Sequence, residues 1–282
     1  MPELAEVEHA RRQWNVGLGA AVREVLIARP EIRVFRGTDV AALRRRLPGR
    51  VLSRSEANGK QMLFHFEPLP GKGEKTRLWL GVHLGMRGDL RVETTADFQP
   101  GKHDHLVLRQ DGGRALVFED QRHFGRILFH EGAEPPAWWT RLAPSVLSAE
   151  FTRDGLADFL QRRRRSPLKA ALLMQEKFPG VGNWMADEIL WRARLHPATP
   201  AGAVAADKRR LTELFQQIRW VAQTASEVIS DNWTYPPTWL FLHRWEPGGF
   251  CPRRGCGAAL ERATIGGRTT CWCPRCQGKV ES

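Results

Sequence analysis

The sequence predicts an α+β multidomain protein, with an N-terminal β-sandwich and flanking helices, a C-terminal helical domain and a small module that contains every cysteine. Three observations support this fold class. Short segments of alternating polar and apolar residues, separated by turn formers, fill residues 22–131. Apolar residues then recur at helical spacing over about 151–229. All cysteines lie between Cys251 and Cys276. The predicted domains are therefore 1–132, a linker at 133–150, 151–237 and 238–282.

The N-terminal domain begins with a predicted helix over residues 3–14, whose first turn is acidic and therefore suits the helix dipole. A second helix is expected at 40–47. The alternating segments predict an antiparallel sandwich or barrel. These segments are 22–28, 60–67, 77–85, 88–93, 104–110, 114–120 and 125–131.

The helical domain contains two clear elements, residues 166–178 and 183–197, joined by the tight turn Pro-Gly-Val-Gly. Asn183 occupies a natural N-cap position for the second helix. A helix start after a glycine-rich turn presents free backbone amides, and these bind phosphate without reading sequence. Taken alone, the same pattern also describes an ordinary helical hairpin. Beyond it, a short segment at 230–238 leads to a strand-like stretch at Trp239.

The cysteines are grouped as two short-spaced pairs, Cys251 with Cys256 and Cys273 with Cys276. Two such pairs can place four sulfurs around one Zn²⁺ ion. Four thiolates leave no open position, so we expect one structural zinc rather than a catalytic one. Cys271 is left over; it either replaces Cys273 as a ligand or packs inside the hairpin as a small apolar residue.

The composition favours a soluble partner-binding protein with an excess of positive charge. Lys and Arg total 43 against 31 Asp and Glu, a formal charge of +12, and the pI is about 10.2. Such a pI is an electrostatic indication of nucleic-acid binding. No apolar run approaches the roughly 20 residues that span a bilayer, and the start lacks the pattern of a signal peptide. We therefore expect no membrane partner and a cytoplasmic location.

Several motifs together resemble the formamidopyrimidine-DNA glycosylase/endonuclease VIII family. They are MPELAEVE at 1–8, NGK at 58–60, HLGM at 83–86, DQRHFG at 120–125, GVGN at 180–183 and the cysteine module. The matches occur in the family's order and extend from residue 2 to residue 276. The resemblance implies a monomeric bacterial base-excision repair enzyme that acts on double-stranded DNA with damaged bases or abasic sites. Its zinc finger would belong to the DNA-binding part.

The resemblance implies that Pro2 is the nucleophile once Met1 has been removed. A terminal proline offers a secondary amine that titrates near pH 8, so a useful fraction is neutral at physiological pH. Attack on the sugar C1′ gives an iminium ion whose fixed charge promotes β- and then δ-elimination. Glu3 would donate a proton to the sugar or base, Glu6 would hold this network, and Lys60 would assist. Glu3 and Glu6 also fit the simpler description of first-turn helix acids.

The same resemblance implies that Lys60, Asn183 and Arg268 grip phosphates around the lesion. Met86, Arg122 and Phe124 correspond to a wedge that fills the gap left by a flipped nucleotide. Met86 and Phe124 could instead be core residues.

Departures from the family pattern affect the substrate more than the chemistry. Ala5 replaces a usual proline, Trp184-Met185 replaces Ile-Tyr, and four residues separate the first cysteine pair. The 230–238 segment is short, whereas the formamidopyrimidine branch usually carries a longer loop there that covers an extruded oxidised purine. The ending FLHRWEPGGFC resembles the endonuclease VIII branch, and the Arg122–Phe124 wedge resembles the formamidopyrimidine branch. Two other functions remain open: a non-catalytic protein that binds DNA lesions, and a zinc-ribbon RNA-binding module that would leave the N-terminal motif unexplained. Retention of Met1 would make Pro2 an amide and remove the nucleophile.

Overall fold

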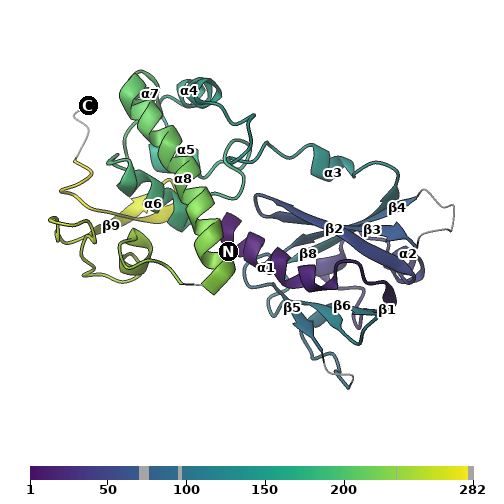
Figure 1. The fold of residues 1–282 in the computed structure, drawn as a ribbon. Coiled ribbons are helices and arrows are strands. Elements are labelled where there is room, and N and C mark those ends of the chain that lie inside the picture. The colour runs from purple at the N-terminus through teal and green to yellow at the C-terminus, as the bar shows by residue number, and fades with distance from the viewer. Residues whose placement is uncertain (70–75, 95–96, 233, 279–282) are drawn as a thin grey trace. The chain divides into compact units, whose positions relative to one another are not determined.

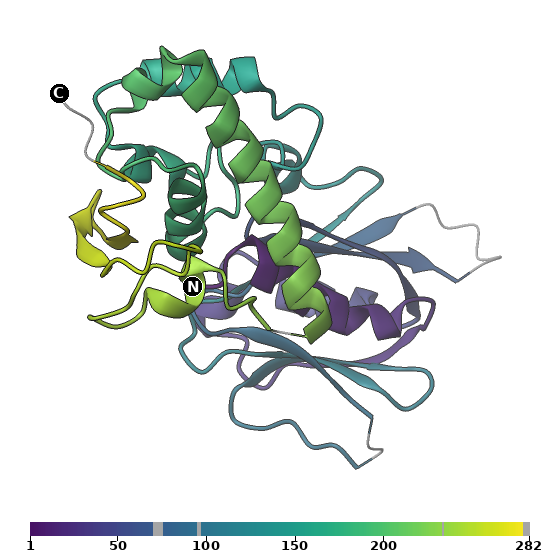
Figure 2. The same ribbon diagram turned by 60° about the vertical axis from the view of Figure 1, so that its left-hand side comes forward.

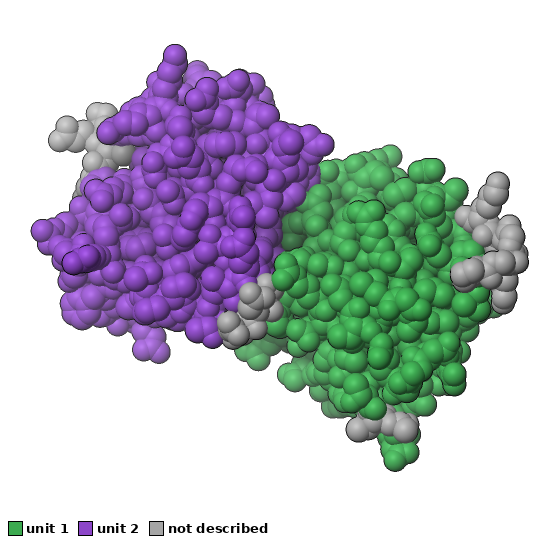
Figure 3. Space-filling model, in the orientation of Figure 1, with its two compact units in different colours: residues 1–2, 6–142 green, residues 3–5, 143–282 purple. Residues whose placement is uncertain are grey.

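The computed structural model describes residues 1–69, 76–94, 97–232 and 234–278 (Figure 1). The chain divides into two compact units, coloured separately in Figure 3. The N-terminal unit comprises residues 1–2 and 6–142, and the C-terminal unit comprises residues 3–5 and 143–282. The division falls after Leu142, inside the segment predicted as a linker, which also contains the short helix α3 (Ala137–Thr140).

The N-terminal unit contains two four-stranded antiparallel sheets. One has the strand order β1-β6-β7-β5 and the other β2-β3-β4-β8. The strands are β1 (Val22–Leu26), β2 (Arg50–Asn58), β3 (Gln61–Pro68), β4 (Arg77–His83), β5 (Asp89–Glu93), β6 (Asp104–Gln110), β7 (Ala115–Glu119) and β8 (Arg126–Gly132).

One hydrophobic core joins these two sheets, which makes the unit a β-sandwich. Alternate residues of β4 (Leu78, Leu80 and Val82) enter this core and meet Leu106 and Leu108 of β6. Side chains from α1 (Leu4–Gln13), η1 (Trp14–Gly17), η2 (Arg33–Phe35) and α2 (Val40–Arg46) complete it. The predicted sandwich with flanking helices is confirmed.

Strand β2 is absent from the predicted strands, and its position explains why. It lies at the edge of its sheet, where it pairs with β3, and it forms one isolated bridge, between Val51 and Ala21. Its second half, Ser53–Asn58, is polar and partly or fully exposed, so the alternation that reveals a half-buried strand is missing. A register shift between Leu52 and Arg54 breaks the period further.

The C-terminal unit is helical, as predicted. Its helices are α4 (Arg153–Arg162), α5 (Leu168–Leu172), α6 (Asn183–Arg192), α7 (Ala201–Ala205) and the long α8 (Lys208–Asn232), drawn in light green in Figure 2. Helix α5 is much shorter than the predicted 166–178. Beyond it, Gln175 donates hydrogen bonds to the carbonyls of Leu173 and Val181 and accepts one from Gly180 N. Its amide therefore stabilises a turn where the helix was expected to continue.

The cysteine module contains a two-stranded hairpin of β9 (Glu261–Ile265) and β10 (Arg268–Trp272). Gly266 and Gly267 form its turn with φ values of +61° and +75°, which glycine adopts without strain. The sequence suggested a strand at Trp239. Instead, Trp239 directly precedes the short helix η3 (Leu240–His243). Over the described residues, none of the helices has both the length and the apolar character needed to cross a membrane.

Candidate functional site

The carboxylate of Glu3 caps helix α6, although the two lie 179 residues apart in the chain. One Glu3 oxygen accepts from Gly182 N and Met185 N, and the other accepts from Trp184 N, each at 3.0 Å. Leu4 N also donates to Gly180 O at 3.0 Å. Glu3 is only 4% exposed. The start of the chain is therefore bound to the turn and first residues of α6.

This arrangement corrects two expectations about the glycine-rich turn. Gly182, not Asn183, is the N-cap residue of α6, and Asn183 is the first residue inside the helix. Three amides at this helix start, those of Gly182, Trp184 and Met185, are not free for phosphate, because the Glu3 carboxylate accepts from them. Glu3 supplies the negative charge that the N-terminal end of a helix attracts.

Glu3 is also not a first-turn acid of its own helix. It precedes α1, whose first-turn acid is Glu6. Pro2 and Glu6 are both half-buried. Glu3 is the neighbour of Pro2 in the sequence. Its carboxylate, however, bonds to backbone amides of the C-terminal unit.

Lys60 lies in the two-residue turn that joins β2 to β3. Asn58 pairs with Gln61 across this turn, and Gly59 has a φ of +63° at its first central position, as a type II′ turn requires. Lys60 is close enough to His83 to affect it. Burial lowers the pKa of His83, and the positive charges of Lys60 and Arg126 lower it further.

The predicted wedge residues are exposed and sit on adjoining loops of the N-terminal unit. Met86 is 39% and Phe124 41% exposed, so the alternative that they are core residues is wrong. Gly85 has a φ of +65°, and a side chain there would meet the backbone of Phe124 at 2.4 Å. The loop that carries Met86 therefore packs directly against the loop that carries Phe124, while Arg122 lies 5.0 Å from the Phe124 ring.

Asp120 shapes the second of these loops, a role that the sequence did not suggest. Its side chain is fully buried and accepts from Arg122 N at 3.0 Å and Gly125 N at 2.6 Å. His123 between them has a φ of +55°, an uncommon conformation for a residue with a side chain. The Asp120 carboxylate thus holds the tight bend that presents Arg122 and Phe124.

Asn183 and Arg268 are brought together in the C-terminal unit. The Asn183 amide nitrogen donates to Thr269 O at 2.9 Å, and Thr269 follows the exposed Arg268 at the start of β10. At the hairpin tip, Gly266 approaches Ala170 so closely that a Cβ would lie 2.7 Å from the Ala170 methyl group. The third predicted phosphate ligand, Lys60, belongs to the N-terminal unit.

A buried ion cluster on Asp187 supports this pair, and sequence reasoning missed it. Asp187 accepts from Lys169 Nζ at 2.5 Å, Arg244 Nη2 at 2.6 Å and Cys271 N at 3.1 Å. It therefore joins α5, α6, β10 and the residue that directly follows η3. Burial lowers the pKa of Lys169, whereas Asp187 opposes that shift. An acid inside the apolar helix NWMADEILWR was the available signal.

The four predicted metal ligands converge. The Sγ atoms of Cys251, Cys256, Cys273 and Cys276 all lie within 4.8 Å of one another. The separations include 3.5 Å between Cys256 and Cys276 and 3.6 Å between Cys256 and Cys273. Tetrahedral Zn–S bonds of about 2.3 Å require sulfurs about 3.8 Å apart, so the residues fit such an ion. Cys271 lies outside this group, and burial raises the pKa of its thiol to about 11.

Two family models match the chain. Residues 1–127 match the formamidopyrimidine-DNA glycosylase N-terminal domain, and residues 142–234 match the formamidopyrimidine-DNA glycosylase H2TH domain. The formamidopyrimidine-DNA glycosylase of Exiguobacterium sibiricum is 32% identical, over 98% of this chain and 99% of that protein. The chain belongs to the formamidopyrimidine-DNA glycosylase family.

Solved structures of the family share the whole fold. A Lactococcus lactis Fpg bound to DNA that contains an abasic site is 26% identical, with a TM-score of 0.82 over 98% of this chain and all of that one. The same protein with DNA that contains N7-benzyl-Fapy-dG gives a TM-score of 0.81 at 25% identity, over 99% of this chain and all of that one. The cysteine module of this chain follows the two matched domains. It lies in the part of the chain that aligns with these solved structures.

Proposed function

We propose that this DNA glycosylase is bifunctional: it excises oxidised bases from duplex DNA through a Schiff base on Pro2 and then cuts the strand by β,δ-elimination. Family membership supports the glycosylase reaction, since the curated relatives carry that name. The observation that carries the proposal is the binding of Glu3 to helix α6. These bonds fix Glu3, the residue next to Pro2, to the helical domain. The Lactococcus lactis relative, which shares this fold, is bound to DNA that contains an abasic site.

The proposed reaction begins after removal of Met1. The neutral Pro2 nitrogen attacks C1′ and displaces the base, which leaves with a proton. The C1′–O4′ bond then opens as O4′ takes up a proton, which leaves an iminium ion at C1′. Its positive charge is fixed, because the iminium nitrogen of a proline has no N–H proton to lose. Loss of a C2′ proton then expels the 3′ phosphate, and a second elimination expels the 5′ phosphate. Glu6 is proposed to hold this network in place, and Lys60 is proposed to assist by gripping a phosphate beside the lesion.

Glu3 is proposed as the proton donor to the sugar oxygen or the leaving base. Both its oxygens accept amide hydrogens in the described conformation. Such bonds suit the ionised carboxylate, so they oppose the uptake of the proton that Glu3 would donate. That proton would sit on the oxygen that accepts from Trp184 N, because the other oxygen accepts two of the three amide bonds.

Phosphate binding is proposed for Lys60, Asn183 and Arg268, and the wedge role for Met86, Arg122 and Phe124. The exposure of the wedge residues and the pairing of Asn183 with the Arg268 hairpin support these roles. Each neutralised phosphate should contribute about −0.9 to the slope of log K against log salt. Arg268→Ala should therefore make that slope shallower by about one, and an unchanged slope would remove Arg268 from the contacts.

The metal is proposed to be a single structural Zn²⁺, held by Cys251, Cys256, Cys273 and Cys276. Four thiolates favour zinc over hard cations, which prefer oxygen ligands. When bound, the ion cross-links the two ends of the module around the β9–β10 hairpin. We further propose that the protein acts as a monomer in the bacterial cytoplasm, as the bacterial origin of its curated relatives favours.

Borohydride trapping on abasic and oxidised-base duplexes tests the reaction. It should reduce the imine to a stable protein–DNA adduct, and peptide mapping should place the adduct on residue 2. A residue added before Pro2 should abolish trapping without changing duplex affinity. An adduct on a lysine of the untagged protein would overturn the assignment to Pro2. Tight duplex binding without any adduct would instead favour a non-catalytic lesion-binding protein.

A further inference from the structure

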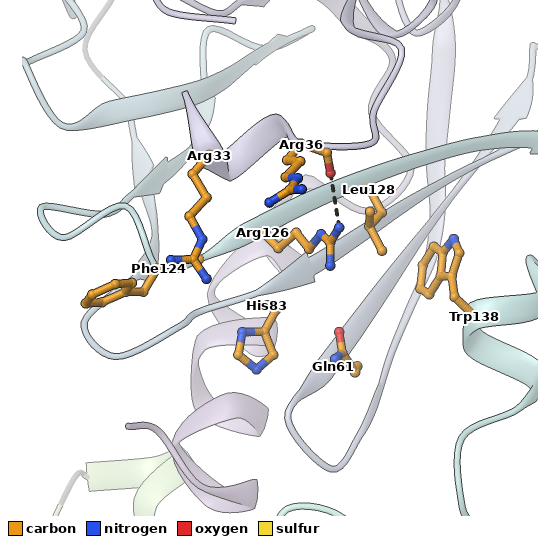
Figure 4. A pocket seen from close by; sticks show the side chains of 9 residues that line it. Arg33, Arg36, Gln61, His83, Phe124, Arg126, Leu128 and Trp138 are labelled. Atoms are coloured by element: carbon orange, nitrogen blue, oxygen red, sulfur yellow. Dashed lines mark hydrogen bonds between the residues drawn. The ribbon is translucent and has the colours of Figure 1, made fainter. Parts of the chain in front are cut away.

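A pocket of about 630 Å³ lies on the N-terminal unit, on the sheet that contains β3, β4 and β8 (Figure 4). Its floor includes a row across three strands, because Gln61 pairs with His83 and His83 pairs with Arg126. Leu128 follows two residues after Arg126 on the same face of β8. The pocket is therefore built on paired strands rather than on a loose loop.

Positive charge is concentrated in this pocket. Arg33, Arg36 and Arg126 all line it, and none of its nine lining residues is acidic. Figure 4 shows the three guanidinium groups between the Phe124 ring and the Trp138 indole. Arg126 Nη2 donates to Arg36 O at 3.2 Å, which joins the η2 segment to β8. The Arg33 guanidinium lies over the Phe124 ring at 5.6 Å.

His83 adds a directed donor to the floor. Its Nδ1 atom accepts from Gly85 N at 3.0 Å, so the neutral ring carries its proton on Nε2. Burial and the nearby cations Lys60 and Arg126 lower the pKa of His83, which keeps the ring neutral at physiological pH. A neutral ring with a fixed tautomer offers one N–H group, and Gln61 beside it offers an amide.

Trp138 forms the far wall and is fixed in place. Its ring lies over Gly81 of β4, where a Cβ would be 2.3 Å from the indole. Only glycine leaves room for this contact. Trp138 comes from the short helix α3, which lies in the segment that the sequence predicted to be a plain linker. This part of the chain therefore contributes a rigid aromatic surface next to the arginines.

We propose that this pocket binds a backbone phosphate of the DNA duplex, close to the base step that Phe124 enters, with Arg36 and Arg126 as its charged ligands. The inference rests on the proposed function, because it takes Phe124 as the wedge. Phe124 is both a wall of the pocket and the expected point of entry into the base stack. A duplex held by that residue brings a phosphodiester, an anion, to a surface of cations and N–H donors. The guanidinium group suits phosphate through its fork of donors.

Equilibrium binding to a duplex with one tetrahydrofuran abasic analogue tests this proposal, because the analogue cannot form an imine. Arg126→Ala should weaken binding and make the slope of log K against log salt shallower by about 0.9, the contribution of one phosphate. Arg36→Ala should also weaken binding and make the slope shallower, and the double variant should lose no more than about 0.9, because both arginines serve one phosphate. Arg77→Ala is the matched control: it removes an exposed arginine from the same sheet outside the pocket and should leave the slope unchanged.

Methylphosphonates placed one at a time along both strands then locate the contact. In the wild-type protein, one neutral linkage near the lesion should reduce affinity, and Arg126→Ala should abolish the effect of that linkage alone. A slope for Arg126→Ala equal to that of Arg77→Ala would overturn the inference, even if the wild-type protein binds the duplex and is trapped by borohydride. The inference would also be overturned if Arg126→Ala weakened the binding of a nucleoside monophosphate but left the slope of log K against log salt for the duplex unchanged. Failure of the wild-type protein to bind the duplex would instead refute the proposed function.

Discussion

At the scale of single residues, Glu3 in the N-terminal motif MPELAEVE holds the start of helix α6 through three backbone amides. The residues of the motif could be recognised, but the partners of Glu3 could not, because they lie 179 to 182 positions away. Local sequence suggested that Asn183 caps α6, since asparagine is favoured there. A distant carboxylate with three amide contacts occupies that place instead. The role of Asp120 was also not predictable from the sequence. Asp120 belongs to the motif DQRHFG, but its role as the hydrogen-bond acceptor of a tight loop depends on the backbone conformation of that loop.

The Glu3 contact leads to a prediction about stability. Glu3→Ala would leave three buried amides at the start of α6 without their acceptor, at a cost of about 2 kcal/mol or more in the free energy of unfolding. Glu8→Ala is the control, because Glu8 forms partly exposed pairs with Arg11 and Arg12 within one helix. Its loss should cost about 0.5 kcal/mol. Urea unfolding measures both, and equal costs would contradict the capping role.

At the scale of elements, regular and strongly periodic segments were predictable and irregular ones were not. The seven expected strands correspond to strands of the two sheets, whereas the polar edge strand β2 was missed. The helix expected at 166–178 is limited to α5. After α5, the Gln175 side chain bonds to the backbone of Gly180 and Val181 and stabilises a turn instead of further helix. The cysteine spacing predicted a four-sulfur cluster with Cys273 favoured over Cys271, and the structure agrees. Cys273 lies in the cluster, whereas the hairpin buries Cys271 beside Asp187.

The cysteine cluster allows a matched pair of variants. Cys276→Ser should lose the zinc, because it removes one of four ligands. Cys271→Ser should keep one zinc per chain, because Cys271 lies outside the cluster. Metal content of the purified proteins, determined by mass spectrometry after dialysis against a weak chelator, distinguishes them. A zinc-free Cys271→Ser protein, or full zinc in Cys276→Ser, would disprove this ligand set.

Helix α6 also carries a pH-dependent element. Burial raises the pKa of Glu188 to about 7, against the opposing effects of Arg192 and the Phe241 amide. Since the unfolded-state pKa is lower, the folded protein holds a proton that the unfolded chain releases. This group should therefore make the protein more stable as pH falls from about 7 towards 4.5, and less stable above that range.

Glu188→Gln should remove that contribution. The free energy of unfolding, measured between pH 5 and 8, should rise less steeply on acidification in the variant than in the wild-type protein. Comparing slopes rather than absolute stabilities separates titration from the lost pairing with Arg192, which lies 2.7 Å from Glu188. Parallel curves would show that Glu188 stays ionised throughout.

At the scale of the whole molecule, family and fold class were predictable because motifs are distributed along the entire chain. The preferred lesion was harder to predict, because the short 230–238 segment argues against a formamidopyrimidine-type purine pocket whereas the Arg122–Phe124 wedge favours that branch. Helix α8 ends at Asn232 and η3 begins at Leu240, which leaves little chain between them. In the described part of this segment, Tyr235 is buried, and its ring stacks on Phe241 at 3.6 Å. Trp233 lies outside the described residues.

A segment anchored in this way can give little cover to an extruded purine. We therefore expect oxidised pyrimidines, ring-opened purines or hydantoins to be excised faster than 8-oxoguanine, with abasic sites cleaved readily. Single-turnover rates on otherwise identical duplexes measure this preference. Removal of 8-oxoguanine opposite cytosine tenfold faster than thymine glycol or dihydrouracil would show that the short segment does not control selection.

The capping of α6 by Glu3 also has a consequence for biosynthesis. Residues 3–5 are synthesised well before the rest of their unit, whose other residues begin at 143. At about 5–20 residues per second, roughly 10–40 s pass between synthesis of Glu3 and synthesis of its partners in α6. During that interval the amino terminus has no folded site to occupy. The C-terminal unit therefore depends on a segment that is made long before the rest of that unit, and it cannot complete its fold until α6 has been synthesised.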